Sequence, residues 1–304
     1  MAPGLSTSLG PLQLSTPLIA ASGTVGSVWE WADMADLSSY GAAVAKSVSP
    51  DPWSGRPRPR LVPTEAGILN GIGIQNPGIE EWAQVMESRI PELGIPVWGS
   101  AVGGDSQGFS LVAKGLQSAG VAAIEVNLSC PNLDDGQMFS FSALRSGEAV
   151  EAVVAASELA VGAKLSPNTP DIVAVAAACR DAGAAFVVLT STAFGFGVSL
   201  RERRPALSGG VGGYSGPGLK PIALRCVYEV SRAIPDLPIV GCGGVSNGRD
   251  VIEYLLAGAA AVGAGTIHLA EPRAGKRIIR ELRGEMERIG ASSVPELVGA
   301  MGEW

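Results

Sequence analysis

Eight short apolar runs recur along the chain, and each is compatible with a buried parallel strand. They occupy residues 17–22, 42–48, 96–102, 122–129, 161–166, 185–191, 238–243 and 260–265. Runs that are almost continuously hydrophobic are typical of parallel strands covered on both faces. The pattern therefore predicts a parallel sheet with other elements on each side.

Helical patterns lie between most of these runs. In residues 169–183, Thr169 or Asp171 can cap the start of a helix and a glycine can end it. Residues 246–258 repeat the arrangement, with Ser246 as the expected N-cap. The alternation predicts a (β/α)8 TIM barrel with elaborated active-site loops, and a doubly wound open sheet is the alternative. No charge-rich or low-complexity linker divides the 304 residues, so we expect a single domain.

Polar residues gather at the carboxyl ends of the predicted strands, the face that carries the active site in barrels. They are Ser22, Lys46, Asn127, Lys164, Ser191 and Thr192. The Pro- and Gly-rich segment 50–78 is too long and irregular for a plain connection, and such loops are usually functional.

Glycines end the last two predicted strands, in residues 241–246 and 263–266. Loops at these positions of a barrel commonly hold a phosphate with backbone N–H groups, which only glycine lets approach closely. Residues 212–221 can add another glycine-lined wall. No GxGxxG unit supports a nicotinamide dinucleotide. FMN fits better, because it needs one phosphate site and a wall for its ring.

Two lysines and one cysteine are the candidates for chemistry. Lys46 and Lys164 lie in apolar runs near strand ends, so two cations at one cavity indicate an anionic ligand or an electron-rich ring. A Schiff-base lysine of the aldolase type is the non-redox alternative. The single histidine, His268, is flanked by apolar residues, which favours a structural role. Cys130 is then the candidate general base, with a thiol whose ordinary pKa is about 8.5.

Composition narrows the classes of partner. The net charge of -7 and the lack of a Lys/Arg run argue against nucleic acid or an anionic membrane. The start lacks a signal-peptide pattern, and no apolar stretch has the length of a membrane span. The four cysteines show no metal-ligand spacing, so we expect no metal site and a cytoplasmic protein with reduced thiols. Cys179, Cys226 and Cys242 are expected to pack in the core.

Several motifs in a fixed order resemble the class 1 dihydroorotate dehydrogenases. They are NGIGIQNPG (70–78), NLSCPN (127–132), KLSPN (164–168), GGYSGPGLKPIALRCVYEV (212–230) and PIVGCGGVSNGRDVIEYLLAGAAAVGAGT (238–266). Residues 215–230 are similar to the 1B branch in particular. The resemblance runs along nearly the whole chain, and such a series is far more specific than any one motif.

The resemblance implies a single FMN-binding barrel that oxidises dihydroorotate to orotate in pyrimidine biosynthesis. Cys130 matches the cysteine that removes the C5 proton while the C6 hydride moves to flavin N5, and Lys46 is the second expected catalytic residue. Positions matching substrate contacts are Lys46, Asn70, Ile72, Gly73, Ile74, Asn127, Asn132, Ser191 and Thr192. Positions matching contacts to the flavin or its phosphate are Ala21, Ser22, Lys46, Asn127, Lys164, Gly216, Gly243, Gly244, Gly265 and Thr266.

The resemblance also implies partners. Members of the 1B branch work with a second subunit that carries FAD and a 2Fe-2S cluster and passes electrons to NAD, and family members are usually homodimers. Fumarate is the alternative acceptor in class 1. Ser191 stands where the family usually has asparagine, so a different dihydropyrimidine or another reduced ring is the alternative substrate. An FMN-binding barrel without turnover is the non-enzymatic alternative.

Overall fold

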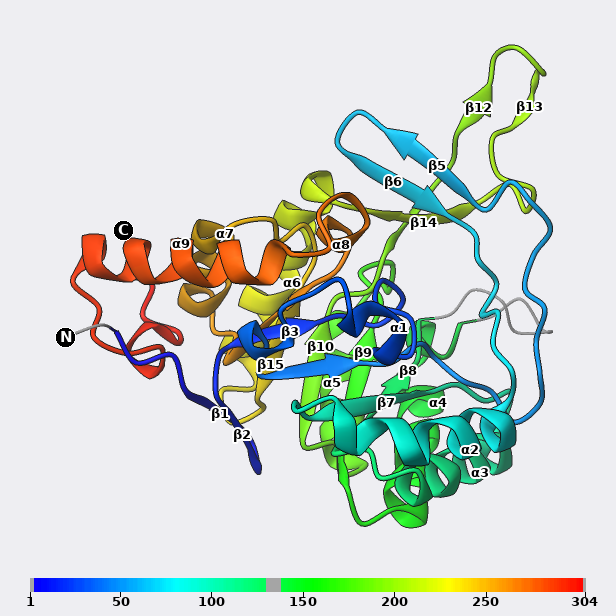
Figure 1. The fold of residues 1–304 in the computed structure, drawn as a ribbon, viewed down its shortest axis with the longest axis horizontal. Coiled ribbons are helices and arrows are strands. Elements are labelled where there is room, and N and C mark those ends of the chain that lie inside the picture. Colours follow the sequence, from blue (N-terminus) through cyan, green and yellow to red (C-terminus); the bar gives the residue numbers. More distant parts are fainter. Residues whose placement is uncertain (1–2, 130–137, 303–304) are drawn as a thin grey trace.

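The computed structural model describes residues 3–129 and 138–302, and its centre is a closed barrel of parallel strands (Figure 1). The strands are β3 (Leu18–Ala20), β4 (Ala42–Val44), β7 (Val97–Ala101), β8 (Ala123–Asn127), β9 (Ala160–Leu165), β10 (Phe186–Leu189), β15 (Ile239–Cys242) and β16 (Ala261–Ala264). They pair in chain order, and β16 returns to pair with β3. The predicted barrel and its eight strands are confirmed.

Helices follow the strands along the chain. They are α1 (Trp29–Ala32), α2 (Ile79–Arg89), α3 (Ser106–Ser118), α4 (Ala143–Ala156), α5 (Ile172–Asp181), α6 (Lys220–Ala233), α7 (Gly248–Leu256), α8 (Ile267–Ala270) and α9 (Ala274–Ile289). Asp171 caps α5, as predicted. The prediction of Ser246 as the N-cap of α7 is wrong, because Asn247 holds that position in a capping box with Asp250. Within the described ranges, no helix is both long and apolar enough to cross a membrane.

A second, antiparallel sheet is formed by segments far apart in the chain. It contains β5 (Leu61–Thr64), β6 (Gly67–Asn70), β11 (Ala193–Gly195) and β14 (Gly212–Ser215). The segment 50–78 is therefore partly ordered into strands and not only an irregular loop. Figure 1 shows β5, β6 and β14 beyond the barrel, with the hairpin of β12 (Val198–Ser199) and β13 (Arg204–Pro205) projecting from them.

Side chains fill the barrel from its amino end. The N-terminal hairpin of β1 (Thr7–Leu9) and β2 (Leu12–Leu14) adds Leu9 and Leu14 to the buried cluster that contains Trp98. Thr7 donates a hydrogen bond of 3.0 Å to the carbonyl of Ala260, just before β16, which places the hairpin at the start of the strands. The packed interior leaves the carboxyl ends of the strands for a ligand site.

Candidate functional site

A cavity of about 290 Å³ opens at the carboxyl ends of the barrel strands and reaches β5, β6 and β14. Predicted residues on its lining are Ala21, Ser22, Lys46, Asn70, Ile72, Gly73, Ile74, Asn127, Lys164, Ser191, Thr192, Gly243, Gly244, Gly265 and Thr266. Of the predicted residues in the described ranges, Gly216 alone is not on the lining, and its carbonyl packs against Gly244. Cys130 and Asn132 lie outside the described residues.

A buried ion pair lies in the cavity wall. Lys164 Nζ is 3.5 Å from Glu125 Oε1, and the two side chains are 9% and 2% exposed. Ser22 Oγ bridges them, because it donates to Glu125 Oε1 at 2.9 Å and accepts from Lys164 Nζ at 3.1 Å. Burial is the largest single effect and would lower the pKa of Lys164, but the charge of Glu125, the Cys242 side chain and the hydrogen bond to Glu125 together raise it above its ordinary value. The cavity wall therefore holds a charged lysine whose ammonium is matched by Glu125.

Asn127 is oriented by hydroxyl groups. Its Nδ2 donates to Ser47 Oγ at 3.0 Å, and Ser47 Oγ lies 2.8 Å from Ser100 Oγ. Its Oδ1 accepts from the backbone N–H of Ser129 at 3.2 Å. These contacts assign the two ends of the carboxamide and hold it at the end of β8.

The loop after β6 forms a lip of the cavity with unusual backbone. Gly73 has a φ of 72° and Ile74 a φ of 53°, a region that a β-branched residue rarely adopts. Asn70 Nδ2 donates to the carbonyl of Gly213 at 3.1 Å and ties β6 to β14. Strained backbone of this kind is typical of ligand sites, where surrounding contacts hold it in place.

Two glycines shape the loop after β15. Gly243 has a φ of 145° and Gly244 a φ of 71°. A Cβ on Gly244 would lie 2.8 Å from the Gly216 carbonyl oxygen and 2.9 Å from both Lys220 N and Lys220 Cβ. The loop can therefore keep this packing against its neighbours only while both positions lack a side chain.

Replacing Gly244 by alanine is expected to lower the stability of the chain by about 1–3 kcal/mol, because the new Cβ adds backbone strain and clashes with Gly216 and Lys220. Gly284→Ala is the matched control, since no atom lies within 4 Å of its Cβ position in α9. We expect the control to be up to about 1 kcal/mol more stable than the native chain. Urea unfolding measures both, and equal stability of the two variants would contradict the assigned geometry.

Ser191 lines the cavity, and its hydroxyl has no hydrogen-bond partner within the part of the chain that the structure describes. Its Oγ is buried and makes no hydrogen bond with the residues described. A buried polar group without a partner is costly, so a ligand atom is the expected partner.

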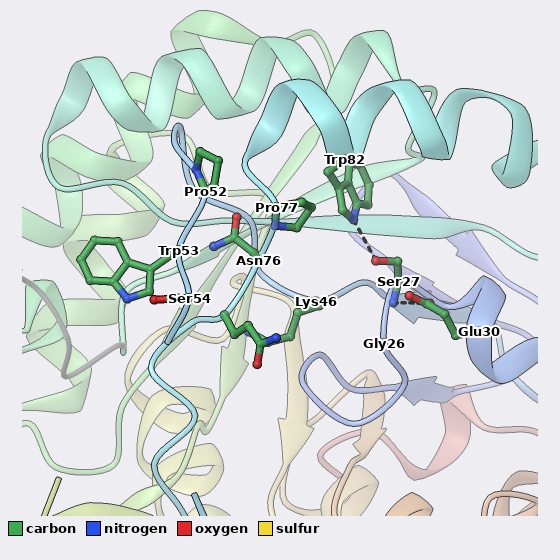
Figure 2. Close-up of a pocket in the computed structure, with 11 residues that line it drawn as sticks. Gly26, Ser27, Glu30, Lys46, Pro52, Trp53, Ser54, Asn76, Pro77 and Trp82 are labelled. Atoms are coloured by element: carbon green, nitrogen blue, oxygen red, sulfur yellow. Dashed lines mark hydrogen bonds between the residues drawn. The ribbon is translucent and has the colours of Figure 1, made fainter. Parts of the chain in front are cut away.

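A second pocket, of about 670 Å³, lies on the other side of Lys46 (Figure 2). Figure 2 shows Trp53, Trp82 and Glu30 around it, and Trp82 Nε1 donates to Ser27 Oγ at 3.0 Å. Lys46 lines both this pocket and the cavity at the strand ends. Its side chain thus stands where the two spaces adjoin.

The remaining cysteines and the histidine are buried. Cys179 and Cys226 are fully buried in α5 and α6, as predicted, and Cys242 is 8% exposed. Cys242 also lines the cavity, and burial raises the pKa of its thiol although Lys164 lowers it in part. His268 is 3% exposed in α8, which agrees with a structural role.

The sequence analysis missed Glu125, although a signal was present. Glu125 is the one acidic residue in the apolar run 122–129, two positions before Asn127. Residues two apart in a strand face the same side, so Glu125 faces the barrel interior with Asn127. Its partner is reached only through the neighbouring strand, where Asn127 pairs with Lys164. Arg56, Thr24 and Ser47 also line the cavity and were not predicted.

Comparison with known proteins finds relatives along almost the whole chain. The family model described as dihydroorotate dehydrogenase matches residues 4–286. A protein of Geobacter sp. (strain M21) named dihydroorotate dehydrogenase B (NAD(+)), catalytic subunit, is 40% identical over 301 residues, which cover 98% of each chain. Proteins of the same name from Alkaliphilus metalliredigens and Listeria innocua are 35% and 37% identical over 298 residues. These alignments cover 98% of each chain for the former, and 96% of this chain and 97% of its relative for the latter.

Proposed function

This chain belongs to the dihydroorotate dehydrogenase family, and we propose that it oxidises dihydroorotate to orotate in pyrimidine biosynthesis. The observation that carries the proposal is the meeting of three features in one cavity. A charge-matched lysine, a glycine loop that excludes side chains and a hydroxyl without a partner among the described residues all lie at the strand ends. We further propose that residues 1–304 act as one FMN-binding unit.

The cavity residues suit a flavin mononucleotide. Gly243, Gly244, Gly265 and Thr266 would hold the phosphate, because they line the cavity after β15 and β16 and a side chain at Gly244 would displace this loop. Lys164 would lie against the ring, where its fixed charge favours an electron-rich reduced form. Ala21, Ser22, Lys46, Asn127 and Gly216 are the other proposed contacts. Bound FMN supplies a two-electron acceptor at N5 for the hydride of the substrate.

Cys130 is the proposed general base, which takes the proton from C5 of dihydroorotate. The described cysteines are poor candidates, since Cys179 and Cys226 are away from the cavity and burial raises the pKa of Cys242. Lys46, at the edge of the same cavity, would bind the anionic substrate and favour the thiolate over the thiol. These roles make Cys130 and Lys46 the proposed catalytic residues.

The proposed substrate contacts in the described ranges line the cavity, and Asn132 lies outside those ranges. The amides of Asn70, Asn127 and Asn132 would pair with the polar edge of the pyrimidine, and the backbone of residues 72–74 would meet its carboxylate. Ser191 and Thr192 would complete the pocket from the end of β10. The fixed orientation of Asn127 supports this assignment, because a carboxamide that cannot rotate presents one hydrogen-bond pattern.

The relatives are named as catalytic subunits, which implies that a partner subunit exists. We infer that the partner carries FAD and a 2Fe-2S cluster and passes electrons from the barrel to NAD. A homodimer of the barrel in the cytoplasm is the proposed core of this assembly.

Orotate formation tests the proposed reaction. The purified chain, supplied with FMN, dihydroorotate and an artificial electron-accepting dye, is expected to form orotate and reduce the dye in equal amounts. A chain that binds FMN but forms no orotate would overturn the substrate assignment, whereas the assignment of the flavin site would stand.

The hydroxyl of Ser191 favours a second candidate, the oxidation of a different reduced pyrimidine. If dihydroorotate pairs with this hydroxyl, Ser191→Ala is expected to raise its KM about threefold to tenfold with little change in kcat. Ser140→Ala is the control, because Ser140 Oγ is also buried with no partner in the described ranges but does not line the cavity. An unchanged KM in Ser191→Ala would show that dihydroorotate does not pair with this hydroxyl.

A further inference from the structure

The single histidine of the chain joins two loops of the cavity. His268 is the second residue of α8 and lies two positions after Thr266, and its ring centroid is 4.9 Å from that of Trp31 and 5.7 Å from that of Tyr40. Its Nδ1 lies 3.1 Å from Thr24 Oγ1 and its Nε2 lies 3.0 Å from Tyr40 Oη. Both ring nitrogens therefore have a hydroxyl partner, and the proposed reaction uses neither.

The hydrogen bonds around the ring fix the position of its proton. Thr24 Oγ1 lies 3.0 Å from the carbonyl of Ala21, which can only accept, so the hydroxyl proton of Thr24 points there. Thr24 Oγ1 must then accept from His268 Nδ1–H. A neutral imidazole carries one N–H, so Nε2 is left to accept from Tyr40 Oη. Burial lowers the pKa of His268 to about 4, which keeps the ring neutral near pH 7.

The series of hydrogen bonds from His268 through Thr24 ends at Ala21 in the cavity wall. Ala21 and Thr24 both line the cavity, at the end of β3. A Cβ on Gly265, after β16, would lie 3.6 Å from Ala21 Cβ and 3.9 Å from Thr24 Cγ2, so the two loops are in contact. At its other end, this series of hydrogen bonds continues from His268 through Tyr40 to the backbone of Gly275 in α9. Thr24 and Ala21 are thus anchored to a helix that does not line the cavity.

We propose that His268, as the Nδ1–H tautomer, is a positioning residue that holds Thr24 and Ala21 against the proposed phosphate loop. The inference rests on the proposed function, since it concerns the wall of the FMN site. His268 acts only through Thr24 and touches no reacting atom. Its loss is expected to loosen cofactor binding without changing the general base.

The tautomer can be measured directly because the chain has one histidine. In the full chain labelled with ¹⁵N-histidine, a two-bond ¹H–¹⁵N spectrum near neutral pH is expected to show a protonated Nδ1 and a bare Nε2. Spectra recorded with and without FMN should agree on this assignment. A protonated Nε2, or a ring protonated on both nitrogens, would overturn the proposal whatever the activity.

Two amide substitutions separate positioning from bulk packing. His268→Asn can keep a donor near the position of Nδ1, whereas His268→Gln places its amide near Nε2. The dissociation constant for FMN, measured by fluorescence on the apoprotein, is expected to stay within about threefold for His268→Asn and to rise about tenfold for His268→Gln. Adding Thr24→Val to His268→Gln should cause no further loss of FMN affinity, because both substitutions remove the hydrogen bond between His268 and Thr24. Tyr40→Phe, which spares the bond to Thr24, should resemble His268→Asn.

Equal FMN affinity in the asparagine and glutamine variants would overturn the positioning role. A native chain that fails to bind FMN would end the proposed function and the cofactor role of His268 together. Native FMN binding with the Nε2–H tautomer would overturn this inference alone.

Discussion

Replacing Cys130 by serine is expected to slow the anaerobic reduction of bound flavin by dihydroorotate about 10²- to 10⁴-fold, the usual range for loss of a general base. A serine hydroxyl is a much weaker acid than a thiol, so no anion is available at neutral pH to take the C5 proton. FMN affinity should stay native, because the glycine loops and Lys164 are untouched. Stopped-flow measurement of the flavin absorbance gives the rate.

Cys242→Ala is the matched control for this prediction. Cys242 is the described cysteine that lines the cavity at the strand ends, but burial raises the pKa of its thiol. Its removal should change the reduction rate by no more than a few-fold. If Cys130→Ser reduced the flavin at the native rate, or if the Cys242 variant were the slow one, the base would have been assigned to the wrong thiol.

Glu125→Gln is expected to destabilise the folded chain by about 3–5 kcal/mol. The substitution keeps the shape of the side chain but leaves the ammonium of Lys164 buried without a counter-charge. The pKa of Lys164 should then fall, because burial favours the neutral amine once the carboxylate is gone. Urea unfolding of the apoprotein measures the loss without interference from cofactor.

Two further variants test that the loss comes from the unmatched charge. Glu253→Gln removes a carboxylate that is 33% exposed in its pairs with Lys220 and Arg249, and it should cost below about 1 kcal/mol. Adding Lys164→Met to Glu125→Gln removes both charges and should restore much of the stability. A Glu125→Gln chain as stable as the native one would mean that the pair is not needed to hold Lys164.

The barrel could be predicted because each of its strands leaves a pattern in its own short stretch of sequence. Strands covered on both faces leave apolar runs that stand out from the sequence, and parallel topology places their carboxyl ends together. For that reason, the sequence alone predicts that three distant residues meet in one cavity, namely Lys46, Asn127 and Lys164. For the same reason, the sequence predicts that the glycines after β15 and β16 lie at the ligand site.

The rest of the site depends on contacts that the sequence does not display. β5 is mostly exposed and contains Pro63, so it lacks a strand pattern. The bond from Asn70 to Gly213 joins residues 143 positions apart. The partner of Glu125 depends on the register between β8 and β9. The N-cap of α7 shifted by one residue because Ser246 and Asn247 can both cap a helix, and only Asn247 meets Asp250 in a capping box.

Anaerobic addition of dihydroorotate to the purified, FMN-loaded chain tests the central claim most directly. The flavin band is expected to bleach fully with about one equivalent of dihydroorotate per flavin, with orotate as the product. A yellow protein that stays oxidised in excess dihydroorotate, although dithionite reduces it, would contradict dihydroorotate oxidation in this cavity.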